Sequence, residues 1–414
     1  MKIFIIHARR TGYGVVRSLK DFTRDIYVAD NEETPVFHSR HVKQGFVISD
    51  INKVSNDEFL EEVITLAKAM EYEKERPIVF TGKDDYLQFF SRNSEVLSPY
   101  FLLSFEANAK VLESALSKKE LIKLAKHANV LIPKSYTDDD LIAEAGRQLT
   151  FPVIIKPAVK NTPEKDIVSE AFRLKVCESP AALDDAIAEL VVLDVPYIVQ
   201  ELIPGGDSEL YTMAIYSWKG RVKAWSLSKK IRQFPPTVGE CSYGKTLYDS
   251  SILEATTRLM ETTGLTGISQ VEYKKCGNDY YLIEINPRVW SWHQIHSKVG
   301  VNLCKIACDH ALGQVSGGVI HPEKGEKYWM FFMMDVLHNR LLNRNVSWVA
   351  LLRDFLTCDI EAFFSWSDPK PFLVHFLETM KYIKRLRQKQ IFQSVTEIIE
   401  KESNNGLKGG HSIG

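Results

Sequence analysis

The first part of the chain alternates between short apolar runs and stretches with helical periodicity. Residues 3–6 are apolar and predict a buried strand, a helical stretch follows to Leu19, and residues 27–30 predict a second strand that ends in an acid. A helix over 59–70 and a strand over 77–81 continue the series. Strands that alternate with helices favour an open parallel sheet, so this part is predicted to be an α/β domain.

The pattern changes after about residue 112. A helix is predicted from Lys118 to about His127, and several strands then follow with few helices between them. Residues 218–221 are typical of a hairpin turn, which joins antiparallel strands. This region is therefore predicted to be α+β, with strands at 130–133, 151–156, 197–203, 210–216 and 222–227 and a helix over 251–263.

A second hairpin is predicted between residues 268 and 286. Two alternating runs flank the turn-like sequence 276–279. If the pairing is centred on Asn278, Glu272 faces Glu284 and Gln270 faces Asn286. Two facing carboxylates repel each other, and a divalent cation such as Mg²⁺ would remove that penalty. The alternative is a register shifted by one residue, which would place the two glutamates on opposite faces.

Charged residues also stand at two other strand ends, and each group can be interpreted in two ways. Lys156 closes an apolar strand, where it either binds an anion or extends along the sheet edge to water. Asp84 and Asp85 follow the strand at 77–81, where ligands bind in open α/β sheets, or they cap the next helix.

The glycines after the first strand give only part of a dinucleotide-binding fingerprint. Gly12 and Gly14 are present, but Arg17 stands at the third glycine position. A scaffold role for this α/β unit is therefore favoured over NAD binding and over an NAD-dependent oxidoreductase.

The last hundred residues differ from the rest. Residues 316–400 predict helices, and the stretch 381–389 is basic with apolar residues between the charges. A solvated helix face is favoured there over an interfacial membrane contact. The polar, glycine-rich residues 401–414 predict a disordered tail.

Composition narrows the class of protein. The 414 residues are 45% hydrophobic and 25% charged, which predicts a globular protein of several domains. A formal net charge of −1 argues against a large nucleic-acid surface. The six cysteines form no CxxC pair or disulfide framework, so a cytoplasmic location is expected. We find no apolar run of transmembrane length.

The order of these features resembles the ATP-grasp superfamily over roughly residues 1–315. The resemblance rests on two lysines, at 118 and 156, on the strand end 199–205, and on the hairpin ending Glu284-Ile285-Asn286-Pro287-Arg288, twelve residues after Glu272. The N-terminal unit resembles the domain that precedes the grasp in carbamoyl-phosphate synthetase, biotin carboxylase and D-alanine–D-alanine ligase. Within the superfamily, the chain most resembles the stand-alone carboxylate–amine ligases.

The resemblance implies a domain order. It implies a Rossmann-like domain over 1–112 that precedes the grasp, and a two-lobed ATP-grasp domain over 113–198 and 199–315 with an antiparallel sheet. A helical C-terminal extension over 316–400 and the tail 401–414 follow.

The resemblance also implies roles for individual residues. ATP would be bound by Lys118, Lys156, Gln200, Glu201, Leu202, Ile203 and Glu209. The metal ligands would be Glu272, Glu284 and Asn286, and the catalytic cations Arg288 and Arg232, with Lys230 beside the latter. Residues 160–166 take the place of the family's phosphate lid but lack glycine.

The activity implied is an ATP-dependent ligation of a small carboxylate to an amine through an acyl phosphate. Mg²⁺ is the expected metal, with Mn²⁺ as a substitute. Neither a nucleic-acid partner nor a transmembrane segment is expected. Homodimers are common in the resembling family, so the resemblance implies a homodimer. The alternative is a regulatory or scaffold protein that keeps the nucleotide site without turnover. Trp290, Trp292, His293 and His296, just after the hairpin, either shape a substrate site or pack in the core.

Overall fold

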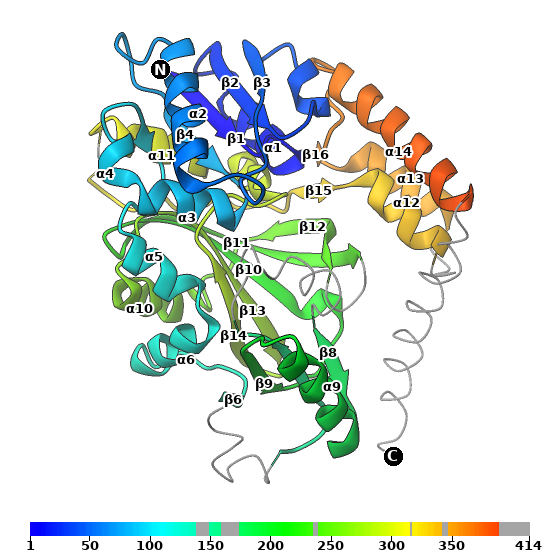
Figure 1. Ribbon diagram of the computed structural model, residues 1–414. Coiled ribbons are helices and arrows are strands. Elements are labelled where there is room, and N and C mark those ends of the chain that lie inside the picture. The colour runs from blue at the N-terminus through cyan, green and yellow to red at the C-terminus, as the bar shows by residue number, and fades with distance from the viewer. Residues whose placement is uncertain (138–148, 159–173, 235–238, 315–316, 342–346, 389–414) are drawn as a thin grey trace.

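The computed structural model describes residues 1–137, 149–158, 174–234, 239–314, 317–341 and 347–388, which form three β-sheets and the helices around them (Figure 1). The N-terminal sheet has the strand order β3-β2-β1-β4-β5, and all its neighbouring strands are parallel, as the alternating pattern predicts. Its strands are β1 (Lys2–Ile6), β2 (Asp25–Asp30), β3 (Gln44–Val47), β4 (Ile78–Thr81) and β5 (Leu102–Leu103).

Helices cover both faces of this parallel sheet. Successive residues of a strand point to opposite faces, so Ile3 and Ile5 pack with α1 while Phe4 and Ile6 pack with α2 and α3. Every residue of β1 is buried, which explains its unbroken apolar pattern. The helices here are α1 (Arg10–Leu19), η1 (Pro35–His38), α2 (Asn56–Ala69), α3 (Asp84–Arg92) and α4 (Ser94–Leu97).

A four-stranded antiparallel sheet forms the smaller lobe of the second region. Its order is β6-β9-β7-β8, and α9 (Pro180–Val192) packs on it. The strands are β6 (Ser135–Thr137), β7 (Val153–Pro157), β8 (Lys175–Cys177) and β9 (Tyr197–Glu201). The boundary predicted between residues 198 and 199 lies inside β9. Two helices, α5 (Ala109–Leu116) and α6 (Lys118–His127), precede this sheet.

A seven-stranded sheet forms the larger lobe, in the order β14-β13-β10-β11-β12-β15-β16. Its pairs are antiparallel except for β15 with β16. The strands are β10 (Leu210–Trp218), β11 (Arg221–Phe234), β12 (Glu240–Leu247), β13 (Gly267–Cys276), β14 (Asp279–Asn286), β15 (Tyr328–Met330) and β16 (Ile360–Glu361). The helices of this lobe are η4 (Asp207–Glu209), α10 (Leu253–Thr263), η5 (His293–Val299) and α11 (Leu303–Ala311). The α/β and α+β architecture predicted from the sequence is confirmed.

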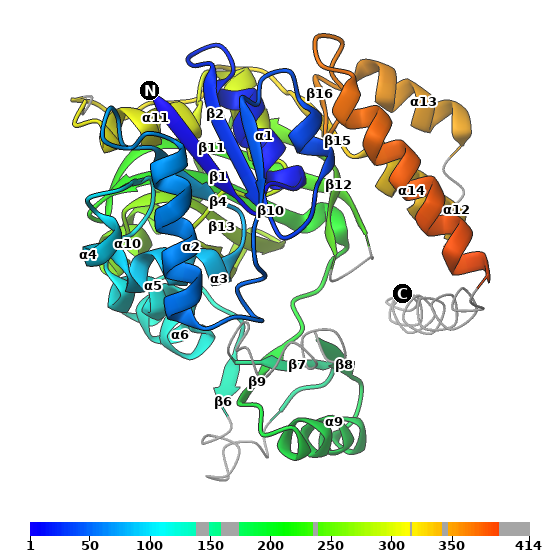
Figure 2. The ribbon, with the colours of Figure 1, turned by 45° about the horizontal axis from the view of Figure 1, so that its top comes forward.

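The C-terminal extension contains more than the helices expected over residues 316–400. It includes α12 (Phe332–Leu341), α13 (Trp348–Thr357) and α14 (Lys370–Gln388), but β15 and β16 of the same segment complete the large sheet. The three helices lie beside these two strands in both views (Figures 1 and 2). The side chain of Asp368 joins the extension to the N-terminal domain, since it accepts hydrogen bonds from Ser39 and Tyr13 and from the Arg40 N–H. No helix in the described part of the chain is long and apolar enough to cross a membrane.

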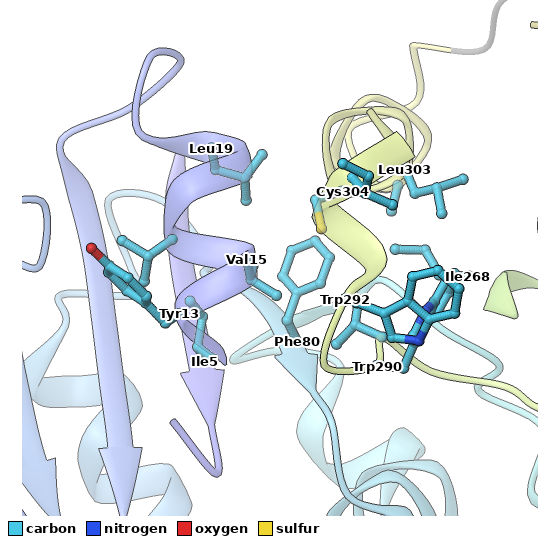
Figure 3. Packing of buried hydrophobic residues seen from close by; sticks show 14 of the residues in the cluster. Ile5, Tyr13, Val15, Leu19, Phe80, Ile268, Trp290, Trp292, Leu303 and Cys304 are labelled. Carbon is cyan, nitrogen blue, oxygen red and sulfur yellow. The ribbon is translucent and has the colours of Figure 1, made fainter. Parts of the chain in front are cut away.

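One hydrophobic core joins the N-terminal domain to the large lobe. Figure 3 shows Val15 and Leu19 of α1 facing Leu303 and Cys304 of α11, with Trp290 and Trp292 close by. Both tryptophans are at most 3% exposed, and His293 and His296 are also buried. Core packing, one of the two readings of this aromatic group, therefore accounts for the tryptophans.

The buried histidines of this core predict how stability depends on pH. Burial, with a smaller contribution from His293, lowers the pKa of His296 to about 3. The unfolded chain would take up a proton on this side chain below about pH 6.5, whereas the folded protein would not. The free energy of unfolding should therefore fall by roughly 2 kcal/mol for one such histidine between pH 7 and pH 5.

Replacement of His296 by glutamine should flatten that dependence in urea unfolding curves recorded across this pH range. His127→Gln, at the exposed end of α6, is the control and should keep the slope of the unaltered protein. An unchanged slope in the His296 variant would contradict the prediction.

Candidate functional site

In the hairpin of β13 and β14, the residues of the candidate site pair as the sequence predicts. Glu272 is paired with Glu284, and Gln270 with Asn286. The turn itself is tighter than a pairing centred on Asn278 requires, because Cys276 pairs with Asp279. Only two residues lie between that pair, and the first, Gly277, has the positive φ of 61° that tight hairpin turns need.

A β-bulge at Ile283 reconciles the tight turn with the facing glutamates. Tyr273 pairs with Leu282 but Glu272 pairs with Glu284, so Ile283 is an extra residue in β14. Without it, Glu272 would pair with Ile283 and Glu284 would oppose Val271, which is fully buried in the hydrophobic core. The bulge therefore places both carboxylates on the same face of the sheet.

Amide side chains hold the two carboxylates. Gln270 Nε2 donates to a Glu272 oxygen at 2.6 Å, and Asn286 Nδ2 donates to a Glu284 oxygen at 2.7 Å. Asn286 Nδ2 also lies 3.2 Å from Gln270 Oε1, which links the two pairs across the hairpin. Two carboxylates and an amide oxygen on one face form a hard donor set that suits Mg²⁺. Among the described residues no group of three or more His, Cys, Asp or Glu side chains could hold a metal, so a metal at this hairpin would need ligands other than these four side-chain types.

Lys230 is the cation next to this pair. Its Nζ lies 3.4 Å from Glu272 Oε1, and the side chain is almost fully buried. Burial is the largest single effect and opposes the charged form, but the interactions with Glu272, Cys241 and Glu284 together outweigh it, and the pKa of Lys230 is raised. Lys230 therefore stays charged beside the carboxylates.

Arg232 lies in a different environment from Lys230. The pairing of β11 with β12 is irregular on both sides of Arg232. Its guanidinium donates to Asp335 at 2.8 Å and to Asp354 at 3.1 Å, both from the C-terminal extension, and lies over the Tyr243 ring. These carboxylates raise the pKa of Arg232 against the effect of burial. The structure thus ties Arg232 to the extension and brings Lys230, instead, to the carboxylate pair.

Three of the residues predicted to bind ATP line one cleft. Lys118, Lys156 and Gln200 meet there from α6, β7 and β9. Lys118 Nζ donates to the Pro157 carbonyl at 2.6 Å, and the Lys156 side chain is largely buried, as the anion-binding reading of that strand end requires. Aliphatic side chains from both lobes complete the lining: Leu121, Ile122, Ile132, Ile198, Leu282 and Ile283. The bulge residue Ile283 thus contacts the cleft and lies next to Glu284.

The strand end after Gln200 is the edge of the small lobe nearest the cleft. The Glu201 N–H donates to the Lys134 carbonyl at 2.9 Å, and the Leu202 N–H lies 3.4 Å from the Pro152 carbonyl. Ile203 is buried, and none of the described residues accepts a hydrogen bond from its N–H. Glu209 ends η4 a few residues further on and is half-buried.

Arg288 connects the hairpin to the N-terminal sheet. Its Nε donates to Asp84 at 2.6 Å, and this pairing, together with Glu284 and Glu272, raises its pKa against the effect of burial. Lys83, not Asp84, is the capping residue of α3, and it makes no side-chain cap. Asp84 therefore serves to hold Arg288 at the carboxyl end of the parallel sheet.

Sequence reasoning missed one member of this edge, His7. It follows β1 with a φ of 62°, a conformation that is rare for residues other than glycine and that gathers at functional sites. His7 Nδ1 lies 3.6 Å from Asp30 at the end of β2. Burial, followed by Arg9, Lys83 and Arg288, lowers the pKa of His7 to about 3. The position of His7 directly after a buried strand was the available signal, because ligands bind at that end of such sheets.

Two predicted features fall outside the described residues. They are the lid at 160–166 and the tail at 401–414.

Part of the chain matches a known family by sequence. Residues 218–329 match the family model described as ATP-grasp in the biosynthetic pathway with Ter operon. No curated protein matches the chain by sequence.

Solved structures with a similar fold cover most of the chain. An L-amino acid ligase from Bacillus licheniformis aligns with a TM-score of 0.55 and 15% identity, over 75% of this chain and 74% of that one. The biotin carboxylase domain of the Hydrogenobacter thermophilus 2-oxoglutarate carboxylase, in complex with MgADP, ADP and bicarbonate, aligns with a TM-score of 0.60 and 14% identity, over 79% and 73%. The N5-carboxyaminoimidazole synthetase of Staphylococcus aureus, complexed with ADP, aligns with a TM-score of 0.58 and 12% identity, over 83% of this chain and 84% of that one. The chain therefore shares its fold with these structures along most of its length, and residues 218–329 match an ATP-grasp family model.

Proposed function

We propose that the protein is an ATP- and Mg²⁺-dependent ligase that joins a carboxylate to an amine through an acyl phosphate and releases ADP and phosphate. One observation carries the proposal. The facing pair Glu272 and Glu284 adjoins a cleft lined by Lys118 and Lys156. The link is the bulge residue Ile283, which lines the cleft and directly precedes Glu284 in β14. Metal ligands on one side and phosphate-binding cations on the other are the requirements of a phosphoryl-transfer site.

The aliphatic cleft would hold the adenine ring. Its walls are apolar, as a flat aromatic base requires. The backbone of Glu201, Leu202 and Ile203 would supply the polar contacts, and the Ile203 N–H is the donor best placed to do so. Gln200 shapes the wall through its 2.6 Å hydrogen bond to Ser135. Glu209, on the loop that follows, would hold the ribose hydroxyls.

The phosphates would then run from the lysines toward the carboxylate pair. Lys118 and Lys156 would neutralise phosphate oxygens, and the bound Mg²⁺, held by Glu272, Glu284 and Asn286, would offset the charge of the phosphate groups. Lys230 is kept charged beside Glu272 and is the cation we assign to the γ-phosphate.

The reaction needs positioning and charge compensation more than a covalent residue. An oxygen of the substrate carboxylate attacks the γ-phosphorus, the bond to the β-phosphate oxygen breaks, and ADP leaves. The amine nitrogen then attacks the acyl carbon, inorganic phosphate leaves, and the nitrogen loses a proton as the amide forms. Arg288, oriented by Asp84, would neutralise the carboxylate that reacts.

The substrates would bind where Arg288 meets the carboxyl edge of the parallel sheet. Arg9 and Lys83 alternate there with Asp30, Asp84 and Asp85, so both signs of charge are present. Such an edge suits a zwitterion, whose carboxylate and ammonium need opposite partners. One structure of similar fold is named as an L-amino acid ligase, which supports amino acids or peptides as the substrate class. A homodimer and a cytoplasmic location remain predictions.

The direct test is a screen of amino-acid pairs for ADP release, with mass detection of the ligated product. The native protein should release ADP only with Mg²⁺ and a productive pair, and Glu284→Gln should lower the rate by at least about a hundredfold, since it removes a metal-ligand charge while keeping the shape of the side chain. Gln314→Glu, which lies outside the site, is the control for expression and folding.

ATP binding without ADP release for any carboxylate and amine would favour the alternative, a regulatory or scaffold protein. Near-normal turnover in the Glu284→Gln variant would contradict the assignment of Glu284 as a metal ligand.

The phosphate-binding lysines give a second prediction. Lys156→Ala and Lys118→Ala should each weaken ATP binding by about tenfold or more, because a lysine on a phosphate makes a charge-assisted hydrogen bond worth roughly 1.5–3 kcal/mol. Lys123→Ala, on the exposed face of α6, is the matched control and should leave the affinity unchanged. Calorimetric titration measures all three, and equal affinities would exclude the phosphate role.

A further inference from the structure

The last helix of the extension carries an apolar stripe on its exposed face. In α14, Leu373, Phe376, Leu377 and Met380 follow the spacing of one helix face and are 56%, 40%, 58% and 38% exposed. Four large apolar residues in a row on a surface helix indicate a binding surface, since isolated monomers seldom expose contiguous apolar area.

The opposite face of α14 is firmly packed. His375 stacks on Phe363 with a centroid distance of 4.2 Å and lies 5.4 Å from Phe331. Phe372 packs against Phe364, and Asp368, just before the helix, is held by the N-terminal domain. The stripe is therefore the outward face of a helix whose other face already has its partners.

A second exposed apolar group lies on the neighbouring part of the extension. In α13, Trp348, Val349, Leu352 and Leu356 are between 53% and 77% exposed. Trp366, in the turn before α14, is 90% exposed. Figures 1 and 2 show α13 and α14 together at one side of the molecule. We call the exposed apolar residues of these two helices, with Trp366, the extension surface.

The extension surface has a strong positive charge along α14. Residues 370–388 contain five basic residues and one acidic residue, in a chain whose net charge is −1, and Lys389 follows directly. Lys381 and Lys384 are exposed and continue the apolar stripe toward the C-terminal end of the helix. Apolar residues and cations thus share one side of the same helix.

We propose that the extension surface binds the interface of an anionic lipid bilayer. Leucine and phenylalanine side chains would enter the boundary between headgroups and acyl chains, the tryptophans would lie at headgroup level, and the lysines would contact anionic headgroups. A second copy of the chain fits less well. In a two-fold dimer the same patch meets itself, and because residues 370–388 contain one acidic residue, the cations of α14 would find little opposite charge on the partner helix. This inference is independent of the ligase activity.

The test is sedimentation of the full chain with vesicles of phosphatidylcholine mixed with phosphatidylserine, and with vesicles of phosphatidylcholine alone. Binding should require phosphatidylserine and should weaken as salt is added, because screening removes the electrostatic part. The double variants Leu373→Gln/Leu377→Gln and Lys381→Gln/Lys384→Gln should each lower vesicle partitioning by about tenfold. Circular dichroism and ATP binding should be unchanged in both, because all four side chains are exposed and lie outside the cleft.

The matched control is Val191→Gln/Val192→Gln, two apolar residues on α9 that are 61% and 85% exposed but lie on the small lobe. It should bind vesicles as the native protein does. The proposal is overturned if no vesicle binds, if phosphatidylcholine alone binds equally well, or if the α14 variants bind unchanged. A dimer in light scattering that dissociates in the Leu373→Gln/Leu377→Gln variant, with no vesicle binding, would assign the surface to a second copy instead.

Discussion

The convergence of Glu272 and Glu284 depends on one extra residue in β14, Ile283. Without this bulge, the two-residue turn of the hairpin would place Glu284 opposite Val271, in the hydrophobic core. The bulge moves Glu284 to the face that already carries Glu272 and Asn286. Bringing two carboxylates together is unfavourable unless other groups compensate their charge. Here the amides of Gln270 and Asn286 and the ammonium of Lys230 do so.

The rest of the site follows from where the bulge lies in the fold. Ile283 also lines the cleft between the lobes, so the carboxylates and the lysine-lined pocket are neighbours along one strand. Arg288 leaves the same strand toward Asp84, which brings the edge of the parallel sheet to the site. The core between α1, η5 and α11 fixes the sheets relative to each other, since Trp290, Trp292 and Ile295 pack there in one cluster with Val15 and Leu19. The extension fixes β11 from the other side through Arg232, Asp335 and Asp354.

Local sequence patterns were sufficient for much of the fold, since the parallel sheet follows from buried strands that alternate with helices. The Glu272–Glu284 pairing was expected from a turn centred on Asn278, but the structure reaches the same pairing through a tighter turn and the bulge at Ile283. The bulge itself was not predictable, because Ile283 has no feature that distinguishes it from the apolar residues around it. Contacts between distant segments were equally hidden. The partners of Arg232 lie about a hundred residues further along the chain, and the strands β15 and β16 are two or three residues long, too short for a periodic pattern. His7 was missed although its position directly after a buried strand was a signal, and the backbone angle that sets it apart is visible only in the structure.

The central claim is that Glu272 and Glu284 jointly hold the metal that accompanies ATP. Anomalous diffraction from a crystal soaked with Mn²⁺ and a non-hydrolysable ATP analogue tests it most directly. We expect a manganese peak within roughly 2 Å of oxygen atoms from both carboxylates, with the adenine in the cleft beside Ile203. A nucleotide bound with its metal away from either glutamate would contradict it.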